Sequence, residues 1–442
     1  MIILLIQRFL TGITEYEGGF TEMKKFFALL LSLTMILALT ACGGSKSEDT
    51  TPADSDTQEP ASDFKVGFIT LHDENSTYDL NFINAAKAAC EKLGVEYTLI
   101  TNVPEGQECY DKAAELADAG CNIIFADSFG HEDYMIQAAK EFPNVQFCHS
   151  TGTKAHTEGL DNYHNTFASI YEGRYLAGIA AGMKLNEMID SGKITADQAK
   201  IGYVGAFTYA EVISGYTSFF LGARSVCPTA TMEVTFTGSW YDETAEKEGA
   251  EKLIQNGCVL ISQHADSMGA PTACEKAGVP NVSYNGSTVS VGPNTYIISS
   301  RIDWAPYYVY AIQAAMDGKT IDADWTGTLA TKSVVLSDLN TNVAADGTQA
   351  AIDEAMKKLE NGELHVFDVS TFTVTGENVT ADMKTDAEGH LTSYMADVDN
   401  DANMEHDTEV VHDGYFAESE KRSAPYFDIA IDGIVRLDVN FG

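Results

Sequence analysis

The segment Lys65-Val66-Gly67-Phe68-Ile69 returns 135 positions later as Lys200-Ile201-Gly202-Tyr203-Val204. Two further landmarks recur at an offset of 137, namely Gly120-Cys121 as Gly257-Cys258 and Pro143-Asn144-Val145 as Pro280-Asn281-Val282. A repeat of this size is longer than the units of solenoid proteins. Because three landmarks recur in step, the sequence predicts two similar α/β lobes in tandem.

Apolar runs of strand length alternate with segments of helical periodicity in both lobes. In the first lobe we expect strands at 64–71, 95–100, 122–126 and 145–149 and helices at 81–93, 109–119 and 131–142. After a long helix at 170–188, the second lobe is expected to have strands at 201–206, 232–237, 259–264, 281–284 and 296–300 and helices at 211–224, 242–256, 270–277 and 304–316. A helix at 350–359 and an alternating strand at 365–375 follow, and the pattern then weakens. This alternation is typical of βαβ units, which build parallel sheets with helices on both faces.

The N-terminal part of the chain has the pattern of an export signal. Met23-Lys24-Lys25 precedes an apolar run over 26–39, which is short for a membrane span, and Leu39-Thr40-Ala41-Cys42 follows. Leu-x-Ala before a cysteine resembles the bacterial lipobox, which implies cleavage before Cys42 and a diacylglycerol on its sulfur; a transmembrane anchor is the alternative. We interpret residues 1–22 as sequence upstream of the true start, 23–41 as the signal peptide and 42–63 as a flexible, lipid-anchored linker.

Composition excludes some partners. The formal net charge of −38 disfavours nucleic acid, because phosphates would be repelled. With Cys42 assigned to the lipid, seven cysteines remain, none of them in a C-x-x-C pair. Their apolar surroundings favour free thiols over disulfides, although one bridge remains possible.

Open parallel sheets bind ligands at the carboxyl ends of their strands, which locates the candidate site. The residues chosen there are Tyr78, Asp127, Ser128 and Phe129 in the first lobe and Phe207, Glu211, Trp240, Asp266 and Asn285 in the second. Aromatic residues recur in these loops, and the loops contain no Lys or Arg. For the rings, core packing is the alternative role.

A site without fixed cations suits a neutral or cationic ring with polar edges better than a phosphate or a carboxylate. Aromatic side chains stack on nucleobases, and each stack contributes about 1–3 kcal/mol. Asp127 and Asp266 can accept hydrogen bonds from a ring amine or from ribose hydroxyls, and Asn285 can both donate and accept. Sugars also stack on aromatic rings, so both a purine and a sugar remain open.

Enzyme and metal motifs are incomplete in this chain. His131-Glu132-Asp133-Tyr134-Met135 lacks the second histidine of H-E-x-x-H, and we find no G-x-S-x-G, Walker or G-x-G-x-x-G sequence. The acidic run at 397–401 resembles an EF-hand loop but has Ala402 and Thr408 at its strictest positions. His72, His149 and His264 lie at the ends of predicted strands, and we interpret them as polar pocket lining; a metal site is the alternative. We expect no catalytic residues, no metal and no cofactor.

Several ordered motifs between about residues 64 and 366 resemble the basic membrane protein family, the substrate-binding lipoproteins of ABC importers. The motifs are 123–130, 141–147, 171–178, 200–207, 211–215, 221–225, 239–240, 263–267 and 304–308. The resemblance implies a type I periplasmic-binding fold and, commonly, a purine nucleoside or nucleobase ligand. It also implies an ABC permease as partner.

The resemblance also assigns site residues. In the purine-nucleoside members, a Ser-Phe-Asn motif after the first strand supplies a ring that stacks on the ligand, and the resemblance implies that Tyr78 is its substitute here. Phe207 and Asp266 match family positions. Asn285 stands where many members carry Asp, which leaves nucleoside or free base open.

Together these observations predict a monomeric, extracytoplasmic receptor that is anchored to the membrane by its lipid and catalyses no reaction. A sugar-binding protein of the same fold and a secreted nucleoside hydrolase are the alternatives. Lobe 1 is expected to comprise 64–165 with about 300–325, lobe 2 to comprise 166–299 with about 326–366, and 367–442 to form an acidic C-terminal extension.

Overall fold

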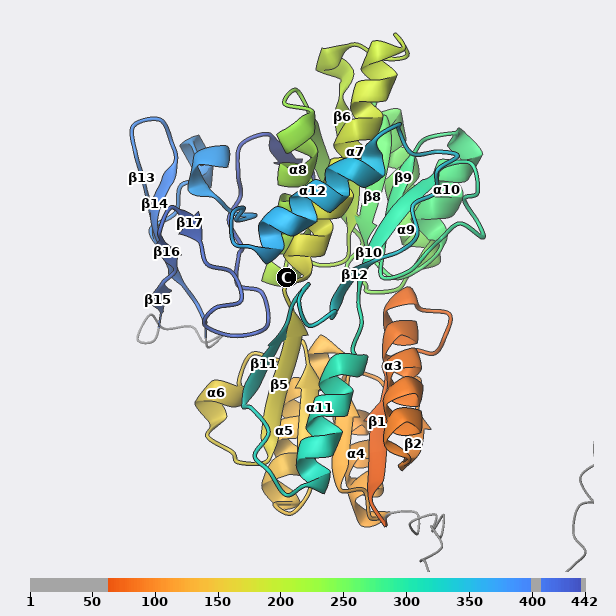
Figure 1. Cartoon of the computed structure of the whole chain (residues 1–442), viewed down its shortest axis with the longest axis vertical. Helices are drawn as coiled ribbons and strands as arrows, with labels where there is room; N and C mark the ends of the chain where they lie inside the picture. Colours follow the sequence, from red (N-terminus) through yellow and green to blue (C-terminus); the bar gives the residue numbers. More distant parts are fainter. Residues whose placement is uncertain (1–62, 399–406, 439–442) are drawn as a thin grey trace, which may run out of the picture. The chain divides into compact units, whose positions relative to one another are not determined.

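The computed structural model describes residues 63–398 and 407–438, which belong to one compact unit (Figure 1). The predicted signal peptide, Cys42 and the linker up to residue 62 lie outside the described residues, as does most of the EF-hand-like stretch. Among the helices that are described, none combines the length and the apolar character that crossing a membrane requires.

Lobe 1 is built on a six-stranded parallel sheet in the order β11-β5-β4-β3-β1-β2. Its strands are β1 (Lys65–Ile69), β2 (Glu96–Ile100), β3 (Ile123–Ala126), β4 (Gln146–Ser150), β5 (Tyr163–Ala168) and β11 (Asp324–Gly327). Its helices are α3 (Thr77–Leu93), α4 (Gln107–Asp118), α5 (Glu132–Glu141), α6 (Ala155–Glu158) and α11 (Ala305–Met316). Phe68 packs with α3 and α11, whereas the next residue, Ile69, packs with α4 and α5. Since successive side chains of a strand point to opposite faces, helices cover both faces of this sheet.

Lobe 2 repeats this plan on a seven-stranded sheet in the order β12-β10-β9-β8-β6-β7-β18. Its strands are β6 (Lys200–Gly205), β7 (Thr231–Phe236), β8 (Leu260–His264), β9 (Asn281–Tyr284), β10 (Tyr296–Ile302), β12 (Val334–Leu336) and β18 (Ile434–Arg436). Its helices are α7 (Ile170–Asp190), α8 (Ala210–Val226), α9 (Glu243–Gln255), α10 (Gly269–Ala277) and α12 (Thr348–Glu360). All neighbouring strands are parallel except β12, which runs antiparallel to β10.

The repeated segment that opens the sequence becomes β1 in one sheet and β6 in the other. The local strand order β2-β1-β3-β4 of lobe 1 matches the order β7-β6-β8-β9 of lobe 2. The predicted α/β architecture of two separate parallel-sheet lobes is therefore confirmed. The chain passes between the sheets at three places, from β5 to α7, from β10 to α11 and from β11 to β12 (Figure 1).

Glycines allow α7 and α8 to cross closely. A Cβ on Gly222 would lie 2.0 Å from the backbone oxygen of Tyr175. We expect Gly222→Ala to lower the free energy of unfolding by about 2 kcal/mol, because two backbones would have to move apart. Chemical denaturation measures this. Gly249→Ala in α9 is the matched control, since its Cβ would come no closer than 3.3 Å to a side-chain methyl; an equal loss in both variants would contradict the account.

The region after residue 366 is more ordered than its weak pattern indicates, and one element was predicted wrongly. The alternating strand expected at 365–375 is replaced by a short 3-10 turn at Val369–Thr371. Its apolar residues Phe367 and Phe372 instead pack on Phe427, with ring centroids 4.2 and 6.1 Å away. The remaining elements are β13 (Met383–Thr385), β14 (Leu391–Ala396), β15 (Thr408–Glu409), β16 (Val411–His412) and β17 (Tyr415–Phe416), and β18 then joins the sheet of lobe 2 beside β7.

Candidate functional site

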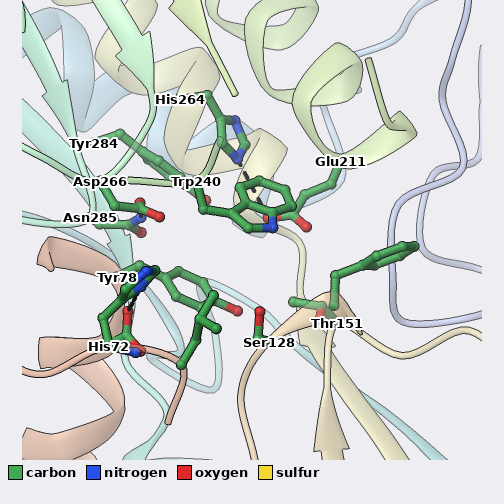
Figure 2. A pocket seen from close by; sticks show the side chains of 13 residues that line it. His72, Tyr78, Ser128, Thr151, Glu211, Trp240, His264, Asp266, Tyr284 and Asn285 are labelled. Carbon is green, nitrogen blue, oxygen red and sulfur yellow. Dashed lines mark hydrogen bonds and ion pairs between the residues drawn. The ribbon is translucent and has the colours of Figure 1, made fainter. Parts of the chain in front are cut away.

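A cavity lies where the carboxyl ends of the strands of both sheets meet (Figure 2). It is lined by Leu71, His72, Tyr78, Asp79, Ser128, Phe129, Thr151, Glu211, Trp240, His264, Asp266, Tyr284 and Asn285. Seven of the nine residues chosen from the sequence are in this set, and Asp127 and Phe207 are not. The space between the side chains measures about 360 Å³ when the part open to solvent is included.

Tyr78 enters the cavity because α3 begins earlier than the sequence pattern predicts. Ser76 caps the helix by accepting a hydrogen bond from the backbone N–H of Asp79, so the first helical residue is Thr77 rather than Asn81. The Tyr78 hydroxyl donates to the backbone oxygen of Asp127 over 2.7 Å. Burial raises the pKa of Tyr78 well above its ordinary value, so its phenol stays neutral.

Asp79 organises the loop that follows β1. It accepts hydrogen bonds from the His72 backbone N–H at 2.7 Å and from the Ser76 hydroxyl at 2.5 Å. Burial by itself would raise the pKa of Asp79, but the bonds from His72 and Ser76 outweigh it and the pKa is lowered. Asp79 is therefore a fixed anion at the edge of the cavity.

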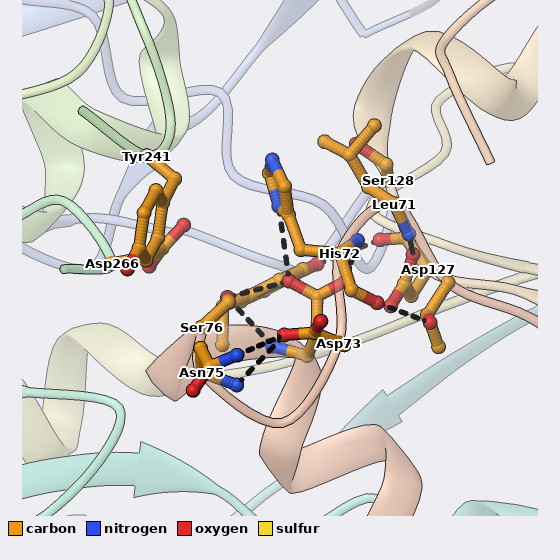
Figure 3. A network of polar contacts seen from close by, with 12 residues as sticks. Leu71, His72, Asp73, Asn75, Ser76, Asp127, Ser128, Tyr241 and Asp266 are labelled. Carbon is orange, nitrogen blue, oxygen red and sulfur yellow. Dashed lines mark hydrogen bonds and ion pairs between the residues drawn. The ribbon is translucent and has the colours of Figure 1, made fainter. Parts of the chain in front are cut away.

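Asp127 has a supporting position rather than a place in the lining. Its Oδ1 accepts from the backbone N–H of Leu71 over 3.1 Å (Figure 3). Burial, and then the charge of Asp79, raise its pKa well above the ordinary value. Through the hydrogen bond to Leu71, Asp127 links the ends of β1 and β3. Its carboxyl favours the neutral form, because it is buried next to Asp79.

Asp266 and Asn285 form a polar pair on the lobe 2 side of the cavity (Figure 2). The Asn285 side-chain amide donates to Asp266 Oδ1 over 3.0 Å. Burial raises the pKa of Asp266 well above its usual range. A ligand that donates hydrogen bonds to this carboxyl would compensate its burial, because hydrogen bonds to the charged form stabilise it.

Two lining residues have left-handed backbone conformations that are rare outside glycine. Asn285 has φ 62° and Thr151 has φ 72°. Asparagine tolerates this region, but a β-branched threonine there is a true outlier. Such strain clusters at ligand sites, where the surrounding structure maintains it. In Thr151 it accompanies a buried hydroxyl with no hydrogen-bond partner among the described residues.

Glu211 and His264 form a second polar pair, in which Glu211 Oε1 lies 3.4 Å from His264 Nε2. Burial lowers the pKa of His264, so its ring is neutral and has one N–H to donate. The ring also packs on Tyr284, with centroids 4.4 Å apart. The contact with His264 uses only Glu211 Oε1, so Oε2 is available to a ligand.

Aromatic side chains from both lobes face the cavity. Trp240 and Tyr78 lie on opposite sides of its open space (Figure 2). Phe207, which was chosen from the sequence, packs against Trp240 at 4.9 Å instead of lining the cavity. The expected stacking surface is therefore Trp240, with Phe207 as its support.

Direct contacts between the lobes close the cavity. Thr77 of lobe 1 donates from its backbone N–H and its hydroxyl to the backbone oxygen of Asp266, both over 3.1 Å. The Asn81 side chain donates to the Asn285 backbone oxygen over 2.8 Å. Phe129 of lobe 1 stacks on Tyr209 of lobe 2, with centroids 5.0 Å apart and planes at 24°. These contacts describe a closed conformation.

Several lining residues were not chosen from the sequence. His72 follows a predicted strand, and His264 and Tyr284 are the last residues of predicted strands, so their positions were available. Asp79 was hidden because the helix was predicted to start too late. His149 does not join them in a metal site, because its Nε2 bonds the Ser128 backbone oxygen at 2.7 Å. Within residues 63–398 and 407–438, no three His, Cys, Asp or Glu side chains are grouped to hold a metal ion. The seven cysteines of this region are free and buried.

Glu246, which is fully buried beneath the loop that contains Asp266, makes the stability of the fold depend on pH. Both of its oxygens accept from the Ser267 N–H, yet burial raises its pKa from 4.5 to about 7. In the folded protein Glu246 keeps its proton up to about pH 7, whereas in the unfolded chain it loses the proton near pH 4.5. The contribution of Glu246 to the free energy of unfolding is therefore fully present below about pH 4.5 and is lost as the pH rises through 7. We expect Glu246→Gln to flatten that decline by about 2 kcal/mol in denaturation at several pH values. The control Glu243→Gln, which changes an exposed carboxylate of the same helix, should leave the decline with pH unchanged. Identical pH profiles of stability for the two variants would contradict the assignment of the decline to Glu246.

The fold and the closed cleft together define a two-lobed solute-binding protein. Two solved structures share this fold: an ABC transporter solute-binding protein from Conexibacter woesei (TM-score 0.56, 21% identity, 68% of this chain and 98% of that chain) and one from Aeropyrum pernix (TM-score 0.58, 18% identity, 71% and 94%). The model of the Bmp family, described as "ABC transporter substrate-binding protein PnrA-like", matches residues 69–366. The chain belongs to the Bmp family of ABC transporter substrate-binding proteins.

Two curated relatives are equally similar in sequence but differ in their described ligands. A purine-binding protein of Brucella abortus is 33% identical over 309 residues, which is 69% of this chain and 83% of the relative. A putative ABC transporter glucose-binding protein of Haloferax volcanii is 33% identical over 282 residues, 63% and 67% respectively. The family is therefore established, and the ligand has to be argued from the site.

Proposed function

We propose that this protein binds a purine nucleoside or nucleobase between its lobes and delivers it to an ABC permease. The observation that carries the proposal is that Trp240 of lobe 2 and Tyr78 of lobe 1 both line a cavity whose thirteen lining residues include no Lys or Arg. Two aromatic faces fit a flat heterocycle, and each stack would contribute about 1–3 kcal/mol. The similarity to a purine-binding relative supports the same choice.

The polar groups of the cavity also fit a purine nucleoside. Asp266 and Asn285 lie together on one side, where they can take ribose hydroxyls, and Glu211 and Ser128 lie elsewhere around the rings, where they can take the edge of the base (Figure 2). A hexose would also satisfy these groups, and it would use the ring faces less fully. For this reason we place a sugar second, as supported by the putative glucose-binding relative.

Delivery requires release as well as capture. Ligand bridging Tyr78 of lobe 1 and Trp240 of lobe 2 would favour the closed state by its differential affinity. We further propose that a lipid on Cys42 holds the receptor at the extracytoplasmic face of the membrane, which raises its effective concentration near the permease. Mass spectrometry of the protein extracted from membranes tests the lipid: an unmodified Cys42 would contradict this part.

A thermal-shift panel of nucleosides, bases and hexoses tests the ligand class, because a bound ligand raises the melting temperature by mass action. We expect purines to raise it and glucose to leave it unchanged. A shift with hexoses alone would contradict the purine proposal. Incubation with inosine followed by chromatography tests the hydrolase alternative, and release of free base would show that the protein is an enzyme.

A further inference from the structure

A second cavity adjoins the ligand cleft and is walled by the C-terminal extension. It is lined by Phe129, Thr151, Thr153, Tyr209, Ala210, Glu211, Arg422, Ala424 and Pro425. Phe129, Thr151 and Glu211 line both cavities, so the two cavities share part of their walls. The residues 422–425 lie beyond the part of the chain that matches the Bmp family model.

Arg422 is held rigidly at this wall. Its Nε donates to the backbone oxygen of Ala424 over 3.2 Å, and its Nη2 donates to that of Pro425 over 3.0 Å. The neighbouring Ser423 is tied to lobe 1, because its backbone N–H donates to Asp324 Oδ2 over 3.0 Å. Glu418, a few residues earlier, accepts from the backbone N–H groups of Tyr426 and Phe427. The guanidinium is therefore pre-organised rather than mobile.

Two buried polar atoms around this second cavity have no hydrogen-bond partner among the described residues. One is Nη1 of Arg422, a residue that is 6% exposed, and the other is the hydroxyl of Thr151, which is 3% exposed. Buried polar groups in folded proteins are almost always paired, so such orphans need an explanation. Arginine can only donate, so the missing partner of Arg422 is a hydrogen-bond acceptor.

The position of Glu211 says what kind of ligand would supply that acceptor. Glu211 accepts hydrogen bonds and Arg422 donates them, and both line the same cavity. A 6-oxopurine such as hypoxanthine or guanine carries an N1–H donor beside an O6 acceptor, whereas adenine carries an acceptor at N1 and a donor amine at position 6. Arginine is also the usual partner of guanine O6 and N7 in nucleic-acid recognition.

We propose that Arg422 of the C-terminal extension, together with Glu211, selects 6-oxopurines over 6-aminopurines, with O6 accepting from Arg422 and N1–H donating to Glu211. This inference rests on the proposed function, since it names the subclass of purine; the 6-position edge of a base bound in the first cavity would pass Glu211, which lines both cavities, to meet Arg422 in the second. Glu418 and Asp324 already offset the charge of Arg422, which favours a neutral oxo group over a phosphate.

Inosine and adenosine test the inference, because they differ only at N1 and position 6. Calorimetric titration should show that the wild type binds inosine about tenfold more tightly than adenosine, a difference of about 1.4 kcal/mol. In Arg422→Gln, inosine should weaken about tenfold and adenosine by less than about twofold. Lys421→Gln, which removes the same charge from an exposed neighbour, is the matched control and should keep the wild-type preference.

Each failure has a distinct meaning. Equal or tighter binding of adenosine by the wild type overturns the inference without any variant and leaves the purine proposal intact. An equal loss of both ligands in Arg422→Gln also overturns it, because that loss reflects structure rather than recognition. Tighter binding of inosine 5′-monophosphate than of inosine overturns the oxo assignment in favour of a phosphate. A wild type that binds no purine at all contradicts the proposed function itself.

Discussion

Replacing Trp240 by alanine should weaken purine binding by about 3 kcal/mol, which is more than a hundredfold in Kd. The indole lines the cavity opposite Tyr78, so its removal takes away one face of the stack and opens the site to water. Titration calorimetry of the variant with inosine measures the loss. The melting temperature of the ligand-free variant shows that the fold is kept.

Two companion variants make this result specific. Phe207 touches Trp240 but does not line the cavity, so Phe207→Ala should cost less, about 1 kcal/mol. Trp325→Ala removes an indole that packs on Tyr307 and Tyr310 of lobe 1, and it should leave the affinity unchanged. A Phe207 variant that loses more than the Trp240 variant would show that the stacking ring has been misassigned.

The second large effect is expected at Asp266, where Asp266→Ala should weaken nucleoside binding by about 2–3 kcal/mol. Asp266 is 4% exposed and has one oxygen bonded to the Asn285 amide, so we expect its other oxygen to accept from the ligand. Asp266→Asn keeps the size and one acceptor but puts a donor where the ligand donates. Both variants should lose affinity.

A conservative change at another aspartate separates the specific role of Asp266 in binding from the effect of the protein's overall negative charge. Asp317→Asn removes one carboxylate from the exposed end of α11, where its partners are Lys319 and Gln313. We expect inosine affinity to be unchanged in this variant when it is measured beside the two Asp266 variants. Wild-type affinity in Asp266→Asn would place the ligand's donors elsewhere in the cavity.

The fold was largely predictable because its signal is repeated. The recurrence of the β1 segment as β6 and the general alternation of strands and helices identify two lobes without any tertiary information. The region after residue 366 was not predictable in the same way. Its Phe367 and Phe372 are buried against Phe427, some 55 to 60 residues away in sequence, and local periodicity carries no record of such contacts.

The candidate site was predictable as a set of loops but not as a set of side chains. The rule that ligands bind at strand carboxyl ends found seven lining residues, since the strands that lead into the cavity are parallel within each sheet. It could not distinguish Trp240 from Phe207, because tertiary packing decides which of these two adjacent rings lines the cavity. It also could not find Thr151 or Arg422. Thr151 lines the cavity with a strained backbone, and Arg422 lines the adjoining cavity from a region that is distant in sequence.

Calorimetric titration of the wild-type protein with inosine and, separately, with glucose tests the central claim most directly. The account predicts one inosine bound per chain with micromolar or tighter affinity, and no measurable heat of binding with glucose. Saturable binding of glucose in the absence of any binding of inosine would contradict it.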